Sequence, residues 1–162
     1  MRLIRCVRAI AGWGVLLVAV GWVGIAGASA APLQDLSGYW TGLASVTLAN
    51  GRSEQLKCVV TYRVAGADLK QSLRCANPST TINAQADLTV TDDRISGRWE
   101  EKTYAATGDV SGRMTSSGLT LSIQGGSFSA AMSIQVTGCQ QSITIAPTSL
   151  DVTKIAIELG KC

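Results

Sequence analysis

The chain has 162 residues, with 14 Lys and Arg, 11 Asp and Glu and no His, which gives a formal net charge of +3 at pH 7. The absence of His excludes nucleophile systems of the Ser-His and Cys-His types and removes the commonest metal ligand. Because Arg2, Arg5 and Arg8 carry the excess charge, the rest of the chain is balanced and lacks the basic surface typical of proteins that bind nucleic acid.

The first thirty residues have the pattern of a secretory signal peptide. Three Arg residues precede an apolar run over residues 9–27, and the run ends at the small residues Ala28-Ser29-Ala30. A secretory signal peptide has a positively charged start, an apolar core and an A-x-A cleavage site, and this segment has all three. We therefore expect signal peptidase to remove residues 1–30. An uncleaved anchor helix is the alternative, since the run is nearly long enough to span a bilayer. After cleavage we expect no stable membrane insertion of the secreted part.

Four cysteines follow the leader, an even number that predicts two disulfides in an exported protein: Cys58, Cys75, Cys139 and Cys162. A structural zinc site is the competing use of four cysteines. These cysteines lack the close C-x-x-C spacing that such sites show, so we expect no metal site.

The pairing of the cysteines follows from hairpin arithmetic, because facing residues of an antiparallel hairpin have numbers that add to a constant. A turn at Gly66-Ala67 places Cys58 opposite Cys75. Facing Cβ atoms lie roughly 4.5 to 5.5 Å apart, close to disulfide distance, so we prefer this pair and assign Cys139 to Cys162 by elimination. The same turn predicts three further facing pairs: Val60 with Leu73, Tyr62 with Gln71, and Val64 with Leu69.

The first strand can be paired in two ways. A two-residue turn at Asn50-Gly51 would point Tyr39, Thr41 and Leu43 inward, whereas a three-residue turn that includes Arg52 would point the other face inward. We prefer the second, which keeps the apolar face continuous. It places Trp40, Gly42, Ala44 and Val46 opposite Tyr62, Val60, Cys58 and Leu56.

The later hairpins continue the same apolar face. The predicted facing pairs are Val90 with Ile95, Ala86 with Trp99, Ala84 with Glu101, Trp99 with Met114, Glu101 with Gly112, Met114 with Leu119, Ile123 with Phe128, and Val136 with Ile143. A longer final turn that carries Pro147 joins the last two strands, residues 142–146 and 152–159.

This pattern predicts an all-β fold, an antiparallel meander of about 8–10 strands with one apolar face. Such a sheet must close into a barrel or fold into a strongly bent sandwich. A transmembrane barrel has an apolar outer face, whereas the outward positions here are charged, so we expect one soluble barrel domain over residues 31–162. The charged outward positions are Lys57, Arg63, Lys70, Arg74, Arg98, Glu100 and Lys102.

Gly38-Tyr39-Trp40 on the first strand resembles the G-x-W motif of the calycin barrels, the lipocalin and avidin-like proteins. Residues 36–40, followed by the cysteines at 58 and 75, are also similar to small periplasmic barrels that inhibit metalloproteases. The mature chain as a whole resembles secreted proteins of Gram-negative bacteria. These resemblances imply a barrel and a periplasmic or secreted location.

The remaining chemistry points away from catalysis. Glu100 and Glu101 are adjacent, so on a strand they point to opposite faces and cannot act as a carboxylate pair on one substrate. No glycine-rich phosphate loop precedes a helix. We therefore expect a protein that is not an enzyme and needs no cofactor.

The inner face predicts either a filled core or a ligand pocket. Large and small residues that simply interlock would fill the barrel. A pocket would have aromatic walls and a few polar anchors, with Trp99 and Glu101 at an opening. The candidate ligand-binding residues are Trp40, Tyr62, Gln71, Trp99 and Glu101.

Two functions fit this face. The first is the binding of a small, partly apolar or amphipathic ligand in the interior or mouth of a non-catalytic barrel. The alternative is a barrel that binds or inhibits a periplasmic protein through its ends, or a structural factor of the cell envelope.

Overall fold

The computed structural model describes residues 33–126, 128–148 and 150–162. The predicted signal peptide therefore lies outside the described residues, as do the first two residues of the predicted domain. No helix in the described part of the chain has the length and apolarity needed to cross a bilayer.

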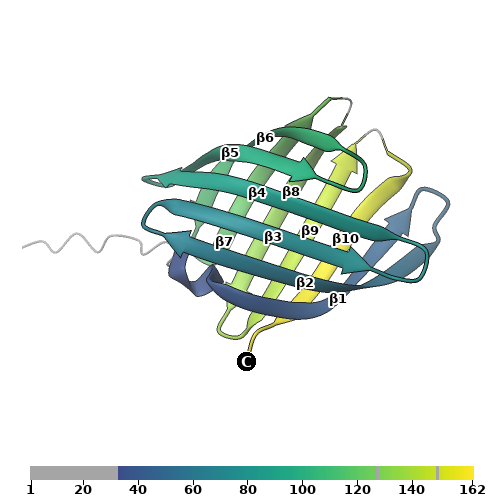
Figure 1. Cartoon of the computed structure of the whole chain (residues 1–162), viewed down its shortest axis with the longest axis horizontal. Helices are drawn as coiled ribbons and strands as arrows, with labels where there is room; N and C mark the ends of the chain where they lie inside the picture. The colour runs from purple at the N-terminus through teal and green to yellow at the C-terminus, as the bar shows by residue number, and fades with distance from the viewer. Residues whose placement is uncertain (1–32, 127, 149) are drawn as a thin grey trace, which may run out of the picture.

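Ten strands form one closed antiparallel barrel in which every strand pairs with its neighbours in the chain and the last pairs with the first (Figure 1). The prediction of an all-β barrel is confirmed, and the closure, with Ala44 opposite Ile157, excludes the bent sandwich. The elements are η1 Leu33–Leu36, β1 Gly38–Leu48, β2 Ser53–Ala65, β3 Asp68–Ala76, β4 Thr81–Thr91, β5 Arg94–Glu101, β6 Ala106–Thr115, β7 Gly118–Gly125, β8 Phe128–Thr137, β9 Gln140–Thr148 and β10 Val152–Gly160.

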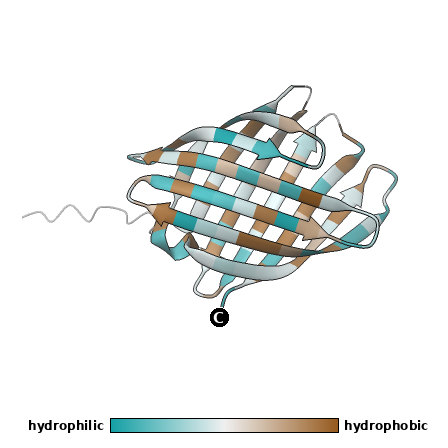
Figure 2. Cartoon of the chain, in the orientation of Figure 1, coloured by the Kyte–Doolittle hydropathy of each residue, from teal (hydrophilic) through white to brown (hydrophobic). Residues whose placement is uncertain are grey.

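The strands form because apolar and polar residues alternate along them, which puts one set of side chains inside and the other outside (Figure 2). The inner set is mostly Leu, Ile and Val. Burying each such side chain stabilises the fold by roughly 1.5–3 kcal/mol. The most deeply buried of the large side chains include Trp40, Tyr62, Leu56, Leu69, Leu119, Ile134, Ile143 and Ile157.

Both predicted disulfides are present. Cys58 and Cys75 are joined across the facing strands β2 and β3, with their Cα atoms 4.1 Å apart. Cys139 and Cys162 are joined with Cα atoms 5.5 Å apart, which ties the end of the chain to the turn between β8 and β9.

Several predicted strand pairings are confirmed. The facing pairs of β2 with β3 and of β4 with β5 are as expected, including Ala86 opposite Trp99. Met114 faces Leu119. The rejected turn at Asn50-Gly51 would have buried Tyr39 and Leu43, but both side chains are at least half exposed on the outside.

Other predicted pairings are wrong in position along the strand. Each error is a shift by an even number of residues, and such a shift leaves every side chain on its predicted face. The observed pairs are Trp40 with Val60, Trp99 with Gly108, Glu101 with Ala106, Ile123 with Ala130, and Val136 with Gln141. Pro147 lies within β9, opposite Ala130, and not in a turn.

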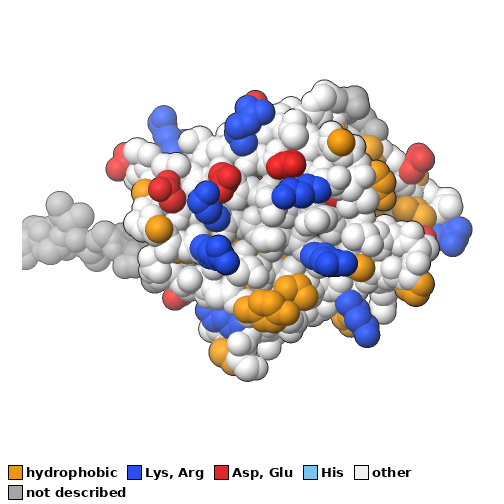
Figure 3. Space-filling model, viewed as in Figure 1, with side chains coloured by type: hydrophobic (Ala, Val, Ile, Leu, Met, Phe, Trp, Pro, Cys, Tyr) orange, Lys and Arg blue, Asp and Glu red, His pale blue; other side chains and the backbone are white. Residues whose placement is uncertain are grey.

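The outer face carries a row of alternating charges across four strands. Asp87 on β4 faces Lys70 on β3 and Arg98 on β5, and Arg98 in turn faces Asp109 on β6. Ion pairs of 3.0 Å join Lys70 to Asp87 and Arg98 to Asp109. Basic and acidic side chains are interspersed over this face (Figure 3). Such exposed pairs each contribute at most about 1 kcal/mol, so they favour one register more than they stabilise the barrel.

Candidate functional site

The two ends of the barrel are filled differently. At the end that holds η1, inward side chains such as Leu69, Leu119 and Ile134 are almost fully buried, while others beside the turns are half-buried: Val64, Val90, Met114 and Val136. At the opposite end, where β1 turns into β2 and β3 into β4, inward side chains remain half-buried. These are Val46, Ile82, Ala84, Trp99, Ile123, Phe128, Ile145 and Ile155. We call this second end the mouth.

A cavity of about 180 Å³ lies inside the barrel on the side of the mouth. Aliphatic side chains contributed by most of the strands form its wall. Gln71 is the one polar residue of the lining whose side chain shares the inward face, and no Lys, Arg, Asp or Glu lines it. The cavity therefore suits an apolar group, with a single polar contact in its wall.

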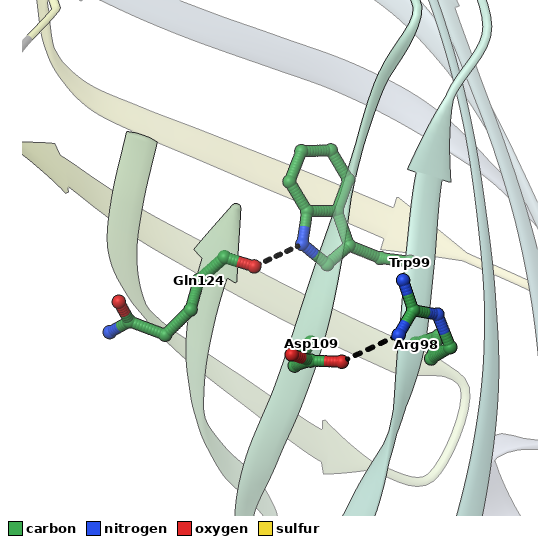
Figure 4. Close-up of polar contacts among 4 residues, drawn as sticks. All are labelled: Arg98, Trp99, Asp109 and Gln124. Atoms are coloured by element: carbon green, nitrogen blue, oxygen red, sulfur yellow. Dashed lines mark hydrogen bonds and ion pairs between the residues drawn. The ribbon is translucent and has the colours of Figure 1, made fainter. Parts of the chain in front are cut away.

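Trp99 and Phe128 form an aromatic wall at the mouth. The two rings meet edge to face, with centroids 5.7 Å apart and planes at 65°. The indole Nε1 of Trp99 donates a 3.1 Å hydrogen bond to the carbonyl oxygen of Gln124 on β7, which fixes the ring across β6 (Figure 4). The neighbouring side chain, Arg98, lies on the other face of β5 and pairs with Asp109 (Figure 4).

Beside the cavity lies a chain of three inward polar side chains, of which Tyr62 and Gln141 are buried and Gln71 is half-buried. Gln71 Nε2 donates to the hydroxyl of Tyr62 at 3.5 Å, and this hydroxyl donates to Gln141 Oε1 at 3.4 Å. Tyr62 is on β2 and Gln141 is on β9, so Tyr62 reaches across the barrel interior. Burial of the phenol raises its pKa far above the ordinary value, and the hydrogen bonds with Gln141 and Gln71 only partly oppose this, so Tyr62 stays a neutral donor.

Trp40 belongs to the filled end. Its side chain is fully buried, and its Nε1 donates a 2.7 Å hydrogen bond to the carbonyl oxygen of Leu36 in η1. The Lys161 ammonium lies 4.6 Å from the ring centroid and also donates to the carbonyl oxygen of Asp35. Trp40 thus joins η1 and the end of the chain into a plug and does not line the cavity.

Glu101 holds a turn and does not line the cavity. The predicted position opposite Gly112 is wrong, because Glu101 faces Ala106 at the end of β5. Its carboxylate accepts backbone N–H groups from Asn83 at 2.7 Å and from Tyr104 at 2.6 Å. Burial alone would raise the pKa of Glu101, but these hydrogen bonds outweigh it and hold the pKa below its ordinary value.

Of the five predicted site residues, the structure places Gln71 and Trp99 on the cavity wall and Tyr62 directly behind Gln71. Trp40 and Glu101 lie elsewhere. Phe128 and Gln141 also belong to this region, although neither was among the predicted site residues. Both follow the inward alternation, Phe128 with Ala130 and Gln141 with Ile143, and this alternation was the signal that could have identified them.

Comparison with known proteins gives a fold and no family. No protein-family model and no curated protein sequence matches the chain. A solved structure with a similar fold is that of an S-type phycobiliprotein lyase from Guillardia theta. It aligns with a TM-score of 0.55 and 12% sequence identity, over 80% of this chain and 90% of that chain. The likeness shows the fold alone, and it agrees with the closed antiparallel barrel described above.

This likeness contradicts our expectation that the chain is not an enzyme, because the similar barrel is named a lyase. The expectation rested on eliminating His-based nucleophiles, metal ligands and paired carboxylates. That elimination does not cover barrels that promote a reaction by binding and orienting their substrate, so it was not a sufficient ground.

Proposed function

We propose that the protein binds a small, mainly apolar molecule, or the apolar end of an amphipathic one, in the cavity at the mouth of the barrel. The observation that carries this proposal is the position of the cavity: η1 and Trp40 plug one end, while about 180 Å³ of apolar space lies toward the other end, beneath half-buried side chains. A concave space with apolar walls usually marks a ligand-binding site.

The size of the cavity limits what enters it. Pockets for drug-sized ligands are roughly 300–1,000 Å³, whereas an apolar cavity of about 150 Å³ accommodates benzene. The space here therefore suits a single ring or a short alkyl group. A larger ligand would insert its apolar end and leave its polar end at the mouth, among the turns that connect the strands.

Toluene titrated into isotopically labelled protein tests the proposal. We expect toluene to shift the methyl signals of Ile82 and Ile145 at the mouth and to leave those of Ile134 at the plugged end unchanged. Ala84→Phe fills the cavity and should weaken binding at least tenfold. Ala131→Phe is the matched control, because Ala131 lies on the exposed face of β8. Equal binding by wild type and Ala84→Phe would reject the cavity as the site.

The proposal includes a location. A leader of the signal-peptide type and two disulfides both favour a protein that acts in the periplasm or outside the cell.

A second candidate function is the binding of a protein by the turns around the mouth. It is favoured by two exposed apolar side chains, Tyr104 between β5 and β6 and Leu150 between β9 and β10. A photo-crosslinking residue at position 104 should capture a defined partner in the native envelope, and a crosslinker at the outward position 131 should not. Equal capture at both positions would reject this candidate.

A further inference from the structure

Among the polar side chains behind the cavity, one hydrogen-bond donor is left unused. Gln141 is only 1% exposed, yet its Nε2 has no hydrogen-bond partner among the described residues. The two bonds that the group does make, at 3.4 and 3.5 Å, lie at the long limit for hydrogen bonds. Buried polar groups are normally satisfied, so this donor calls for an explanation.

The orientation of the two amides determines which atom is left without a partner. Gln71 Nε2 donates to the Tyr62 hydroxyl and this hydroxyl donates to Gln141 Oε1, so Gln141 Nε2 remains a donor without an acceptor in the described part of the chain. None of the three groups is a carboxylate, so the group as a whole is neutral.

We propose that the ligand carries a neutral hydrogen-bond acceptor, a carbonyl, ester or ether oxygen, at the end that enters first, and that the Gln71, Tyr62 and Gln141 group binds this oxygen. This inference rests on the proposed function, because it requires a ligand in the cavity. Gln71 connects the two, since it lines the cavity and contacts Tyr62. The long bonds within the group cost little to rearrange around an incoming oxygen.

The acceptor must be neutral because nothing in the cavity wall balances a negative charge. No Lys or Arg lines the cavity, and a buried carboxylate without a partner carries a large desolvation penalty. A hydroxyl oxygen can also accept from Gln141 Nε2, but its own proton then needs an acceptor in a wall that is almost entirely apolar. The ligand class is thus an apolar ketone, ester or ether, and any charged part of it remains at the mouth.

Two probes of the same shape test this proposal: acetophenone, which has a C=O group, and α-methylstyrene, which has C=CH₂ in its place. Dissociation constants are measured by calorimetry for wild type and for Gln141→Met, which removes the amide at similar volume. We expect Gln141→Met to weaken acetophenone about tenfold more than α-methylstyrene, the effect of one net hydrogen bond. Gln135→Met, on the exposed face of β8, is the control and should change neither.

The outcomes separate this inference from the proposed function. If both probes bind wild type and Gln141→Met leaves the ratio of their affinities unchanged, the acceptor-binding role is rejected and the apolar cavity stands. If neither probe binds wild type, the proposed function fails and this inference fails with it. Should Gln141→Met not fold, side-chain NH₂ signals of Gln71 and Gln141 in wild type decide: they must shift with acetophenone and not with α-methylstyrene.

Discussion

The ring of Trp99 meets the edge of Phe128 at a centroid distance of 5.7 Å, although β6 and β7 lie between their strands. Two glycines make this contact possible. Trp99 faces Gly108 on β6, and Phe128 faces Gly125 on β7, so no side chain of these two residues stands between the rings. The aromatic wall of the mouth thus depends on two positions that have no side chain of their own.

Gly125→Ala should disturb this wall. A Cβ atom at this position would lie 2.8 Å from Trp99 Cζ2 and would also meet the backbone oxygen of Thr107. Crowding of this kind costs about 1–3 kcal/mol, and the displaced indole should also lower the affinity of the cavity for toluene. Urea unfolding followed by tryptophan fluorescence measures the loss of stability.

Gly160→Ala is the matched control for Gly125→Ala. A Cβ atom there has only one close neighbour, the backbone oxygen of Cys139 at an ordinary contact distance of 3.7 Å. We expect it to leave both stability and toluene affinity close to those of wild type. If the two variants behave alike, the close packing of Trp99 over Gly125 is not what forms the wall.

Glu101→Gln should destabilise the fold by about 1.5–3 kcal/mol, the contribution of hydrogen bonds to a charged group. The carboxylate accepts from two backbone N–H groups, whereas the amide of Gln can accept on only one of its two ends and places a donor against the other N–H. Thermal unfolding measures the loss. Glu100→Gln, at the exposed neighbouring position, should have little effect.

The pKa of Glu101 also predicts a pH dependence. Because the folded-state pKa is lowered, the contribution of Glu101 to stability is complete above the unfolded pKa of roughly 4.3 and is lost as the pH falls through the lower folded value. Unfolding free energies between neutral pH and about pH 3 should therefore converge for wild type and Glu101→Gln. Curves that stay parallel throughout would contradict a charged, hydrogen-bonded Glu101.

Replacing Cys58 and Cys75 together by Ala should cost about 3 kcal/mol, because the disulfide closes a loop with a sequence separation of 17. The same double replacement of Cys139 and Cys162, with a separation of 23, should cost a similar amount. Only the first pair includes a residue of the cavity wall, Cys75, so only its loss should alter ligand affinity. Denaturant unfolding and toluene titration of both double variants provide the comparison, after peptide mapping without reductant has verified the pairs.

Export should produce a chain that begins at Ala31, since the small residues that end at Ala30 match the signal-peptidase site. N-terminal sequencing of protein recovered from the periplasm or the medium checks this. Recovery of Met1 on membrane-bound material would instead support the uncleaved anchor.

The alternation of apolar and polar residues correctly predicted which side chains face the barrel interior. The positions of some turns were predicted wrongly, and so was the register of the strand pairs that they join. The predicted pair of Trp99 with Met114 centred a turn between residues 106 and 107, yet both of these residues lie within β6, where Gly108 faces Trp99. The true turn lies earlier and contains Ala105 with a φ of 52°, a conformation unusual for alanine. The Glu101 carboxylate supports this turn by accepting from Tyr104 within it and from Asn83 on β4. The second contact joins residues 18 apart in the chain, so it leaves no local signal in the sequence.

The candidate site was predictable to a similar degree. The alternation of inward and outward positions along each strand identified Trp99 and Gln71 as inward residues, and both line the cavity. This alternation does not predict how far along the barrel axis each residue lies, because that position depends on the stagger of all ten strands. Trp40 therefore had the expected orientation but lies at the plugged end, against Leu36.

Both the first described residues and the end of the chain lie at the plugged end, where the Cys139–Cys162 disulfide and Lys161 hold the tail beside Trp40. The mouth is thus remote from either point of attachment (Figure 1). A tag or a sensor chip coupled beyond Cys162 would orient every molecule with its opening toward the solution. Immobilisation by the C-terminus should therefore preserve full ligand capacity, while coupling through lysines would bury a fraction of the openings against the support.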